Sequence, residues 1–514
     1  MEKTEVDLEA GLSSSPTKTA ESEKHGGDTE SVNGNTSTTP ETALAEIDPT
    51  AKFVVDWAEG DPEKPVNWTT RKKWKNLWIV SGITFITPLA SSMFAPGVPQ
   101  LMQEFKSSNK ELASFVVSVY ILGFAVGPMV IAPMSELYGR KKLYQFCNVL
   151  FCAFTIVCGE SVNLGMLLAF RFWAGCAGVA PLTIGAGSIG DLMAAEERGG
   201  AMAIFSLGPL LGPIIGPIAG GYVTQGIGWR WVFRFLAIGS FVVTIFSLFF
   251  MDETYTPTLL ELRAKKLRKE HNEPLYRSKY ASDLPPRTIF KHAIARPLKL
   301  LFLSPIVSLL SLHVAFVYGL LYLLFTTFTT VFTGIYDFST GSVGLTFLGL
   351  GVGSILGVVI IGGTSDRIYK YYKAKNGGEG KPEYRLPALM WCSMFVPVGL
   401  FWYGWSAQAH VHYIVPILGT VLIAFGMLSV MLPVQSYLVD AYTQYAASAV
   451  AAATILRSLL GALLPLAGQP LFDSLGIGWG NSLLGFLSLA MVPVPWVFWR
   501  YGEKIRLRMK ISLD

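Results

Sequence analysis

The chain has 514 residues, of which 51% are hydrophobic and only 15% are charged, and its formal net charge is +5. Soluble domains carry about 25% charged residues, so this composition excludes an ordinary soluble globular protein. The five cysteines fall inside apolar runs without the spacing of metal ligands. They are therefore interpreted as buried apolar residues, and neither a metal site nor a cofactor is predicted.

The first 75 residues are predicted to form a disordered cytoplasmic tail and a lead-in to the membrane. Residues 1–50 are rich in Ser, Thr, Glu and Gly and contain almost no aromatic residues. Such a segment cannot bury enough apolar surface to fold. It serves either as a plain solvated tail or as a regulatory phosphorylated one. It has no apolar core typical of a cleavable signal peptide.

Twelve apolar runs follow, each near the roughly 20 residues that span a bilayer. They lie at 77–99, 112–134, 143–161, 164–187, 199–223, 230–251, 300–332, 341–363, 386–405, 412–439, 446–471 and 481–500. The seventh is long, and we expect it to begin with a kink at Pro305. The runs predict an all-α membrane protein with two six-helix halves, at 76–251 and 300–500. A linker loop at 252–299 joins the halves, and a tail at 501–514 follows.

Basic residues predict the orientation of these spans. Clusters occur at 71–75, 140–142, 252–299, 364–385 and 500–510, all on one side of the membrane if the spans alternate. Basic loops stay in the cytoplasm, so both termini are predicted to be cytoplasmic. The linker begins with a basic amphipathic segment, which would suit the surface of an anionic membrane.

The segment 208–221, GPLLGPIIGPIAGG, predicts a bent and closely packed membrane helix. Gly208, Gly212, Gly216 and Gly220 recur at every fourth position and therefore share one helix face. Small residues in this pattern let another helix approach closely in a membrane. The prolines that follow the first three glycines each remove a backbone hydrogen bond and bend the helix.

The two halves repeat each other in sequence. Gly226-Ile227-Gly228-Trp229 recurs as Gly476-Ile477-Gly478-Trp479. At nearly the same offset, Asp191 corresponds to Asp440 and Gly212 to Gly461. The turn that begins at Ser135 has a counterpart beginning at Ser365. Duplicated halves with a binding site between them are typical of secondary transporters.

Residues 65–510 resemble the major facilitator superfamily, and within it the fungal twelve-span drug:proton antiporters. The glycine and proline stretch is similar to the antiporter motif of the fifth span. The loop 132–142 is similar to the signature loop between spans two and three, with Ala132 in place of Gly and Glu136 in place of Asp. The segments 171–175, 61–68 and 253–255 add further similarity. The residues of the antiporter-motif helix are Gly212, Pro213, Gly216, Pro217, Gly220 and Gly221.

Charged residues at the cytoplasmic ends of the spans are candidates for a gate. Such charges can pair across the two halves when the inside is closed and separate when it opens. The alternative is a set of static ion pairs that fix the topology. The predicted gate residues are Glu136, Arg140, Asp191, Asp366, Arg367 and Asp440.

Two arginines lie deep within predicted spans. Charges at this depth are costly and face the protein interior or a cavity. The resemblance implies that Arg171 takes part in proton coupling, whereas Arg457 either holds helices together or contacts substrate. His313 is either a titrating group or a packing residue. The first span contains no carboxylate, so the proton carrier stays unassigned. Candidate cavity residues are Tyr120, His313, Tyr318, Tyr322 and Gln435.

These features predict a proton-coupled antiporter that exports drugs, toxins or similar amphipathic organic compounds by alternating access. The alternatives are a polyamine exporter, a nutrient uptake carrier and a transporter-like sensor. A phosphate-binding loop and a clustered acid/base or metal constellation are both absent from the sequence, which disfavours an ATP-driven pump and an enzyme. The expected partners are a small organic substrate, protons and the lipid bilayer, without nucleic acid. The resemblance implies a monomer in the plasma membrane, and a vacuolar membrane fits the sequence equally well.

Overall fold

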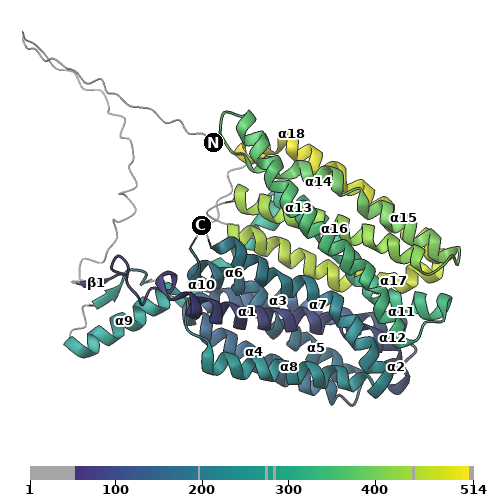
Figure 1. Cartoon of the computed structure of the whole chain (residues 1–514), viewed down its shortest axis with the longest axis horizontal. Coiled ribbons are helices and arrows are strands. Elements are labelled where there is room, and N and C mark those ends of the chain that lie inside the picture. Colours follow the sequence, from purple (N-terminus) through teal and green to yellow (C-terminus); the bar gives the residue numbers. More distant parts are fainter. Residues whose placement is uncertain (1–52, 195–196, 273–275, 282–284, 443–445, 509–514) are drawn as a thin grey trace, which may run out of the picture. The chain divides into compact units, whose positions relative to one another are not determined.

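The computed structural model describes residues 53–194, 197–272, 276–281, 285–442 and 446–508. The expected disorder of residues 1–50 concerns a segment outside these ranges. The described chain is almost entirely helical, and long apolar helices follow one another along it (Figure 1).

The first six spans occupy residues 70–250. Two of them are interrupted, the first by a 3₁₀ turn at a Pro-containing segment and the fourth at Val179. The elements are α1 (Thr70–Ser92), η3 (Ala95–Gly97), α2 (Val98–Glu104), α3 (Lys110–Tyr138), α4 (Arg140–Gly159), α5 (Leu164–Gly178), α6 (Ala180–Leu192), α7 (Arg198–Ile227) and α8 (Trp229–Phe250).

The second set of spans occupies residues 305–508. Its elements are α11 (Pro305–Tyr336), α12 (Thr340–Thr346), α13 (Leu348–Lys375), η4 (Pro382–Arg385), α14 (Leu386–Cys392), α15 (Phe395–Gln408), α16 (Ile414–Ala441), α17 (Ala446–Met491) and α18 (Pro493–Arg508). In the described ranges, 11 helical stretches are long and apolar enough to cross a membrane. The last of them contains two crossings, because Gly476 has a φ of 75° that interrupts α17. The fold is therefore the all-α arrangement of twelve spans.

The sequence-based boundaries need three corrections. The first span begins at Thr70, and the last helix continues to Arg508. Residues 300–303 belong to the linker helix α10 (Pro286–Leu303), and the seventh span starts only after Ser304. Ser304 caps α11 through its hydroxyl, and Pro305 occupies the first helical position, where its missing N–H costs nothing.

The lead-in and the linker form a small ordered module. Strand β1 (Phe53–Val55) pairs in parallel with β2 (Tyr276–Ser278), and α9 (Thr256–His271) lies between them in sequence. Val55 packs against Leu260 and Ala264 of α9. The lead-in therefore covers the apolar face of the amphipathic helix that the sequence suggested for a membrane surface.

Helices of residues 70–250 pack mainly on one another, as do those of 305–508 (Figure 1). Contacts between the two sets run along α3 with α17, and along α7 with α12 and α13. We call the end of the bundle from which the 252–299 linker emerges the linker end, and the other the opposite end. At the opposite end Lys110 pairs with Asp473 at 2.7 Å, and Gly341 donates its N–H to Gln225 at 2.8 Å.

Candidate functional site

At the linker end of the first half, Arg140 joins the third span to the fourth. Its Nε donates to Asp191 Oδ2 at 2.8 Å, and its Nη1 lies 3.5 Å from Ser135 Oγ. The guanidinium also lies over the ring of Tyr255, 4.9 Å from its centroid. Both charged side chains of the pair are mostly buried, so solvent screens this ion pair less than a surface one.

The carboxylate of Glu253 caps the third span. It accepts hydrogen bonds from the backbone N–H groups of Arg140 and Lys141, each at 3.0 Å. The first N–H groups of a helix have no partner within the helix, and a negative charge there is favourable. The segment Glu253-Thr254-Tyr255, which follows the sixth span, is thus built into the network around Arg140.

The second half contains a matching network around Arg385. Its Nε donates to Asp440 Oδ2 at 3.0 Å, and its Nη1 donates to Asp366 Oδ1 at 2.6 Å. The guanidinium lies 4.4 Å from the ring centroid of Tyr369. An arginine over a tyrosine, paired with an aspartate at the end of a span, therefore occurs at the linker end of each half.

Two predictions about these charges differ from the structure. The cation that meets Asp366 and Asp440 is Arg385, whereas Arg367 is exposed and forms no ion pair within the described ranges. The pairs also lie within each half, not between the halves. Glu136 is exposed and forms no ion pair with Arg140 in the part of the chain that the structure describes. Alignment of the two halves on their aspartates does not identify Arg385. Its position at the start of the third span of its half, equivalent to that of Arg140, is the signal that could have found it.

A carboxylate with a similar position follows the last span of each half. Glu503, which lies 250 residues after Glu253, pairs with Lys381 at 2.8 Å. Lys381 precedes the 3₁₀ turn that leads into the third span of the second half. Each half thus uses a carboxylate after its sixth span to hold the beginning of its third.

The glycine stripe of α7 lies against the backbone of α1. A Cβ on Gly208 would lie 2.9 Å from the backbone N of Phe85, and one on Gly212 would lie 2.8 Å from that of Leu89. At Gly220 a Cβ would overlap the carbonyl oxygen of Met93. Gly216 meets the next α1 residues in the same way, and Pro213 and Pro217 lie within the helix between these glycines.

The other side of α7 faces the second half. A Cβ on Gly221 would lie 2.7 Å from the carbonyl oxygen of Thr340, and one on Gly344 would lie 2.6 Å from that of Pro217. Helix α7 is therefore closely packed both against α1 of its own half and against α12 of the other.

The two deep arginines lie among aromatic rings. Arg171 is 1% exposed, and its guanidinium lies 5.3 Å from the ring centroid of Phe94 and 5.5 Å from that of Tyr120. Arg457 lies 5.1 Å from the ring centroid of Tyr318. No carboxylate pairs with either arginine in the described ranges.

A cavity of about 220 Å³ lies between the two halves toward the opposite end. Its walls come from η3, α2 and α3 of the first half and from α11 and α17 of the second. Polar lining residues are Ser107, Ser108, Asn109, Lys110, Ser114, Thr326, Thr329, Thr330 and Gln469.

The predicted cavity residues do not line this cavity. Tyr120, Tyr322 and His313 are buried, Tyr318 is partly buried beside Arg457, and Gln435 is exposed on α16. The Nδ1 atom of His313 has no hydrogen-bond partner among the described residues.

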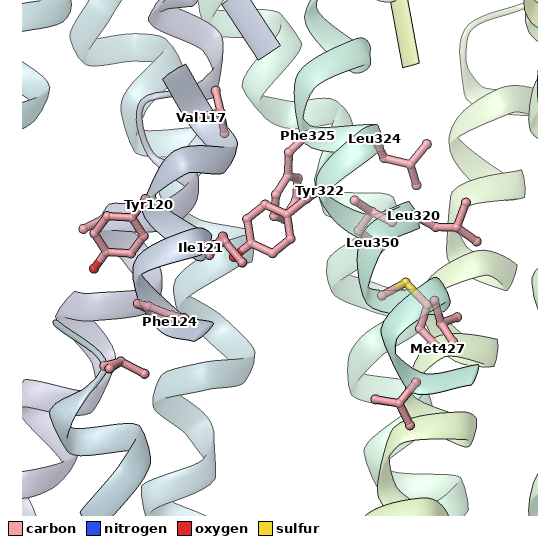
Figure 2. Close-up of a cluster of buried hydrophobic side chains, with 14 of the residues drawn as sticks. Val117, Tyr120, Ile121, Phe124, Leu320, Tyr322, Leu324, Phe325, Leu350 and Met427 are labelled. Carbon is pink, nitrogen blue, oxygen red and sulfur yellow. The ribbon is translucent and has the colours of Figure 1, made fainter. Parts of the chain in front are cut away.

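Instead, the predicted tyrosines lie farther from the opposite end than the cavity does. Tyr322 of α11 shares a hydrogen bond of 3.0 Å with Ser91 of α1, and Tyr120 donates to the carbonyl oxygen of Thr87. Figure 2 shows Tyr322 pointing toward Ile121 of α3. Tyr322 therefore joins α11 of the second half to α1 of the first in this structure.

Comparison with known proteins agrees with this architecture. Residues 80–465 match the family model of the Major Facilitator Superfamily. The chain is 54% identical over 461 residues to the MFS-type transporter penM of Penicillium rubens, covering 90% of this chain and 91% of that one. It is 48% identical over 475 residues to the efflux pump radE of Floropilus chiversii, covering 91% and 88%.

Solved structures show the same fold. A partially occluded, inward-open structure of the xylose transporter XylE from E. coli aligns with a TM-score of 0.63 and 15% identity, covering 84% of this chain and 98% of that one. A bacterial homologue of the lysosomal transporter Spinster aligns with a TM-score of 0.60 and 13% identity, covering 87% and 100%. The family consists of membrane transporters, not enzymes. The chain therefore belongs to the Major Facilitator Superfamily, among its fungal transporters.

Proposed function

We propose that this transporter is a proton-coupled antiporter that exports amphipathic organic compounds by alternating access. The observation that carries the proposal is the packing of α7, whose glycine stripe fits the α1 backbone while Gly221 meets α12 of the other half. Without side chains in these contacts, one helix can rock against its neighbours with small changes in packing. The similarity of this stretch to the antiporter motif supports exchange with protons.

The two arginine networks support a gate at the linker end. Arg140 with Asp191 and Arg385 with Asp440 each hold the third span of a half against the end of another span. Both pairs lie within a half, so they brace the span ends that border the proposed gate. In this proposal they keep each half rigid while the halves move against each other.

Two further observations support the proposed direction and orientation. The name of the relative radE states that it is an efflux pump, which supports export here. The basic clusters support cytoplasmic termini, and the plasma membrane is the proposed location. A polyamine exporter would need buried carboxylates, and the sequence has none in the middle of any span.

The test is transport into sealed vesicles with an imposed pH gradient. The labelled panel contains an azole, a cationic dye, an amphipathic toxin-like acid and spermidine. Movement of a compound against the proton flow, abolished by an uncoupler and by Arg171→Ala, would support antiport. With correctly inserted protein, movement of a compound that ignores the pH gradient would contradict proton coupling.

A further inference from the structure

The charged residues within the membrane interior have one sign. The acidic residues of the described spans lie toward the ends of the bundle, where Asp191 and Asp440 meet arginines and Glu104 and Glu160 meet Arg230 and Arg234. Arg171 and Arg457 lie well inside their spans, seven and eleven residues from the starts of α5 and α17. Within the described ranges, the middle of the spans therefore contains two arginines without a carboxylate partner and no carboxylate.

Arg171 has an incomplete set of partners. Among the described residues, its Nη2 donates a long hydrogen bond to the carbonyl oxygen of Val117 at 3.4 Å. Its buried Nε has no hydrogen-bond partner among the described residues. The aromatic faces of Phe94, Tyr120 and Phe233 attract the cation without neutralising it. A buried cation with so few hydrogen-bond partners is costly, and a ligand of opposite charge would stabilise it.

Arg457 offers a second cation from the other half. Its Nε is also buried without a hydrogen-bond partner in the described ranges. One turn further along α17, Gly461 lies against both Tyr318 and Ile121, since a Cβ there would be 3.0 and 3.2 Å from their side chains. On α1, Thr87 accepts a hydrogen bond from Tyr120, which lies under Arg171. One turn later Ser91 shares a hydrogen bond with Tyr322, whose ring contacts that of Tyr318 under Arg457. The two arginines thus flank the same contact between the halves.

Two unpaired hydroxyl groups lie on the helices that meet here, α3 and α17. Ser118 follows Val117, whose carbonyl binds Arg171, and Ser458 follows Arg457. Both hydroxyl oxygens are buried and have no hydrogen-bond partner among the described residues. Guanidinium and hydroxyl groups together are the donors that recognise carboxylates.

The cavity described above borders the contact near Arg171. Its lining includes Val117 and Thr326, which is one turn from Tyr322. The remaining polar lining consists of hydroxyl and amide groups and Lys110, which is already paired with Asp473. No carboxylate lines it within the described ranges.

We infer that the substrates are amphipathic organic anions, whose carboxylate is held between Arg171 and Arg457 while the aromatic residues hold the apolar body. This inference rests on the proposed export function and specifies its substrate class. An organic cation would meet two like charges with no carboxylate to offset them, which disfavours it strongly in a low-dielectric site. Aromatic residues alone do not distinguish the two classes, but the sign of the fixed charge does.

The test compares two dyes on one xanthene scaffold, the anion fluorescein and the cation rhodamine 123. Binding to the purified full-length protein in detergent is measured by fluorescence anisotropy. We expect fluorescein to bind at least about tenfold more tightly than rhodamine 123. Arg171→Gln and Arg457→Gln should each weaken fluorescein binding by about tenfold or more, and Arg457→Lys should retain most of it.

Arg234→Gln is the matched control, because Arg234 is a membrane arginine already paired with Glu160 at 2.9 Å. It should bind fluorescein as the unsubstituted protein does. If Arg171→Gln does not fold, Arg457→Gln, at a partly buried position, decides the question. Tighter or equal binding of rhodamine 123 would overturn the inference, as would failure of the folded protein to bind either dye. Selective binding of fluorescein without transport in a pH gradient would instead contradict the proposed antiport and would leave the inferred substrate class standing.

Discussion

Arg385 donates a hydrogen bond to Asp440 at 3.0 Å, and so holds the start of the ninth span against the end of the tenth. Arg140 and Asp191 form the same bridge between the third and fourth spans at 2.8 Å. The internal repeat is therefore a repeat of interactions as well as of residues. Both bridges lie at the linker end, where the proposed gate must open and close.

The first prediction concerns the cation of the second network. Arg385→Gln would leave Asp366 and Asp440 without their cation and should shift the balance between inward-open and outward-open states. Removing Arg385 is destabilising, because the charge of the partly buried Asp440 stays behind without its partner. The measurement is labelling of cysteines introduced on either side of the membrane. Arg367→Gln is the control, since Arg367 is exposed and nearby. A larger effect in Arg367→Gln would restore Arg367 as the gate residue.

The second prediction concerns the glycine stripe. Gly220→Ala should destabilise the protein by about 1–3 kcal/mol and reduce transport, because the added methyl group overlaps the Met93 carbonyl. Gly226→Ala on the same helix is the control, because nothing lies within 4 Å of its Cβ position. The readouts are thermal unfolding in detergent and transport in vesicles. Equal behaviour of the two variants would show that close packing of α7 on α1 is not required.

Most of the fold could be predicted from the sequence because membrane spans have a strong signal. Apolar runs of bilayer length locate helices, and the repeat around Gly226 and Gly476 locates the two halves. The boundaries were less accurate, since polar residues at helix ends, such as Arg71 and Arg506, continue the helices beyond the apolar runs. The pairing of β1 with β2 was not predictable, because it joins residues more than 200 positions apart.

The site was only partly predictable, for a physical reason. The charge types at span ends follow from the sequence, but their partners depend on how the spans are packed. Asp366 is next to Arg367 in sequence, yet on a helix adjacent residues point in different directions. Arg385 reaches Asp366 because η4 brings it to the same end of the bundle. The arginines within the spans were identified, whereas the polar lining of the cavity was not.

The third prediction concerns the cap of the third span. Glu253→Ala removes the acceptor for the N–H groups of Arg140 and Lys141 and should lower stability by about 1–2 kcal/mol. Glu253→Gln keeps an acceptor oxygen without the charge and should have a smaller effect. Thermal unfolding of the purified protein measures both. Glu270→Gln, which alters an exposed pair with Lys266 at 3.8 Å, should have no measurable effect. A loss in this control equal to that of Glu253→Ala would point to general charge effects.

The fourth prediction concerns the module formed by the lead-in and the linker. Asp61 is 8% exposed and accepts a hydrogen bond from Arg263 at 2.6 Å, which lowers the pKa of its carboxyl below the ordinary value of 3.8. A lowered folded-state pKa stabilises the module above the unfolded pKa, and the effect is lost as the pH falls through the folded value. The contribution of Asp61 to the stability of the module should therefore be equal at pH 7 and pH 5 and should be lost only below about pH 4.

Hydrogen exchange of residues 276–281, corrected for its intrinsic pH dependence, measures this stability. Lys279 donates its backbone N–H to the Val55 carbonyl, so its protection reports on the attachment of the lead-in. Asp61→Asn should lower the protection at pH 7 and remove the change expected below pH 4. Asp56→Asn is the comparison, because Asp56 pairs with Lys279 through exposed side chains, which water screens. Loss of protection between pH 7 and pH 5 in the unsubstituted protein would contradict control by Asp61, because the carboxyl stays ionised throughout that interval.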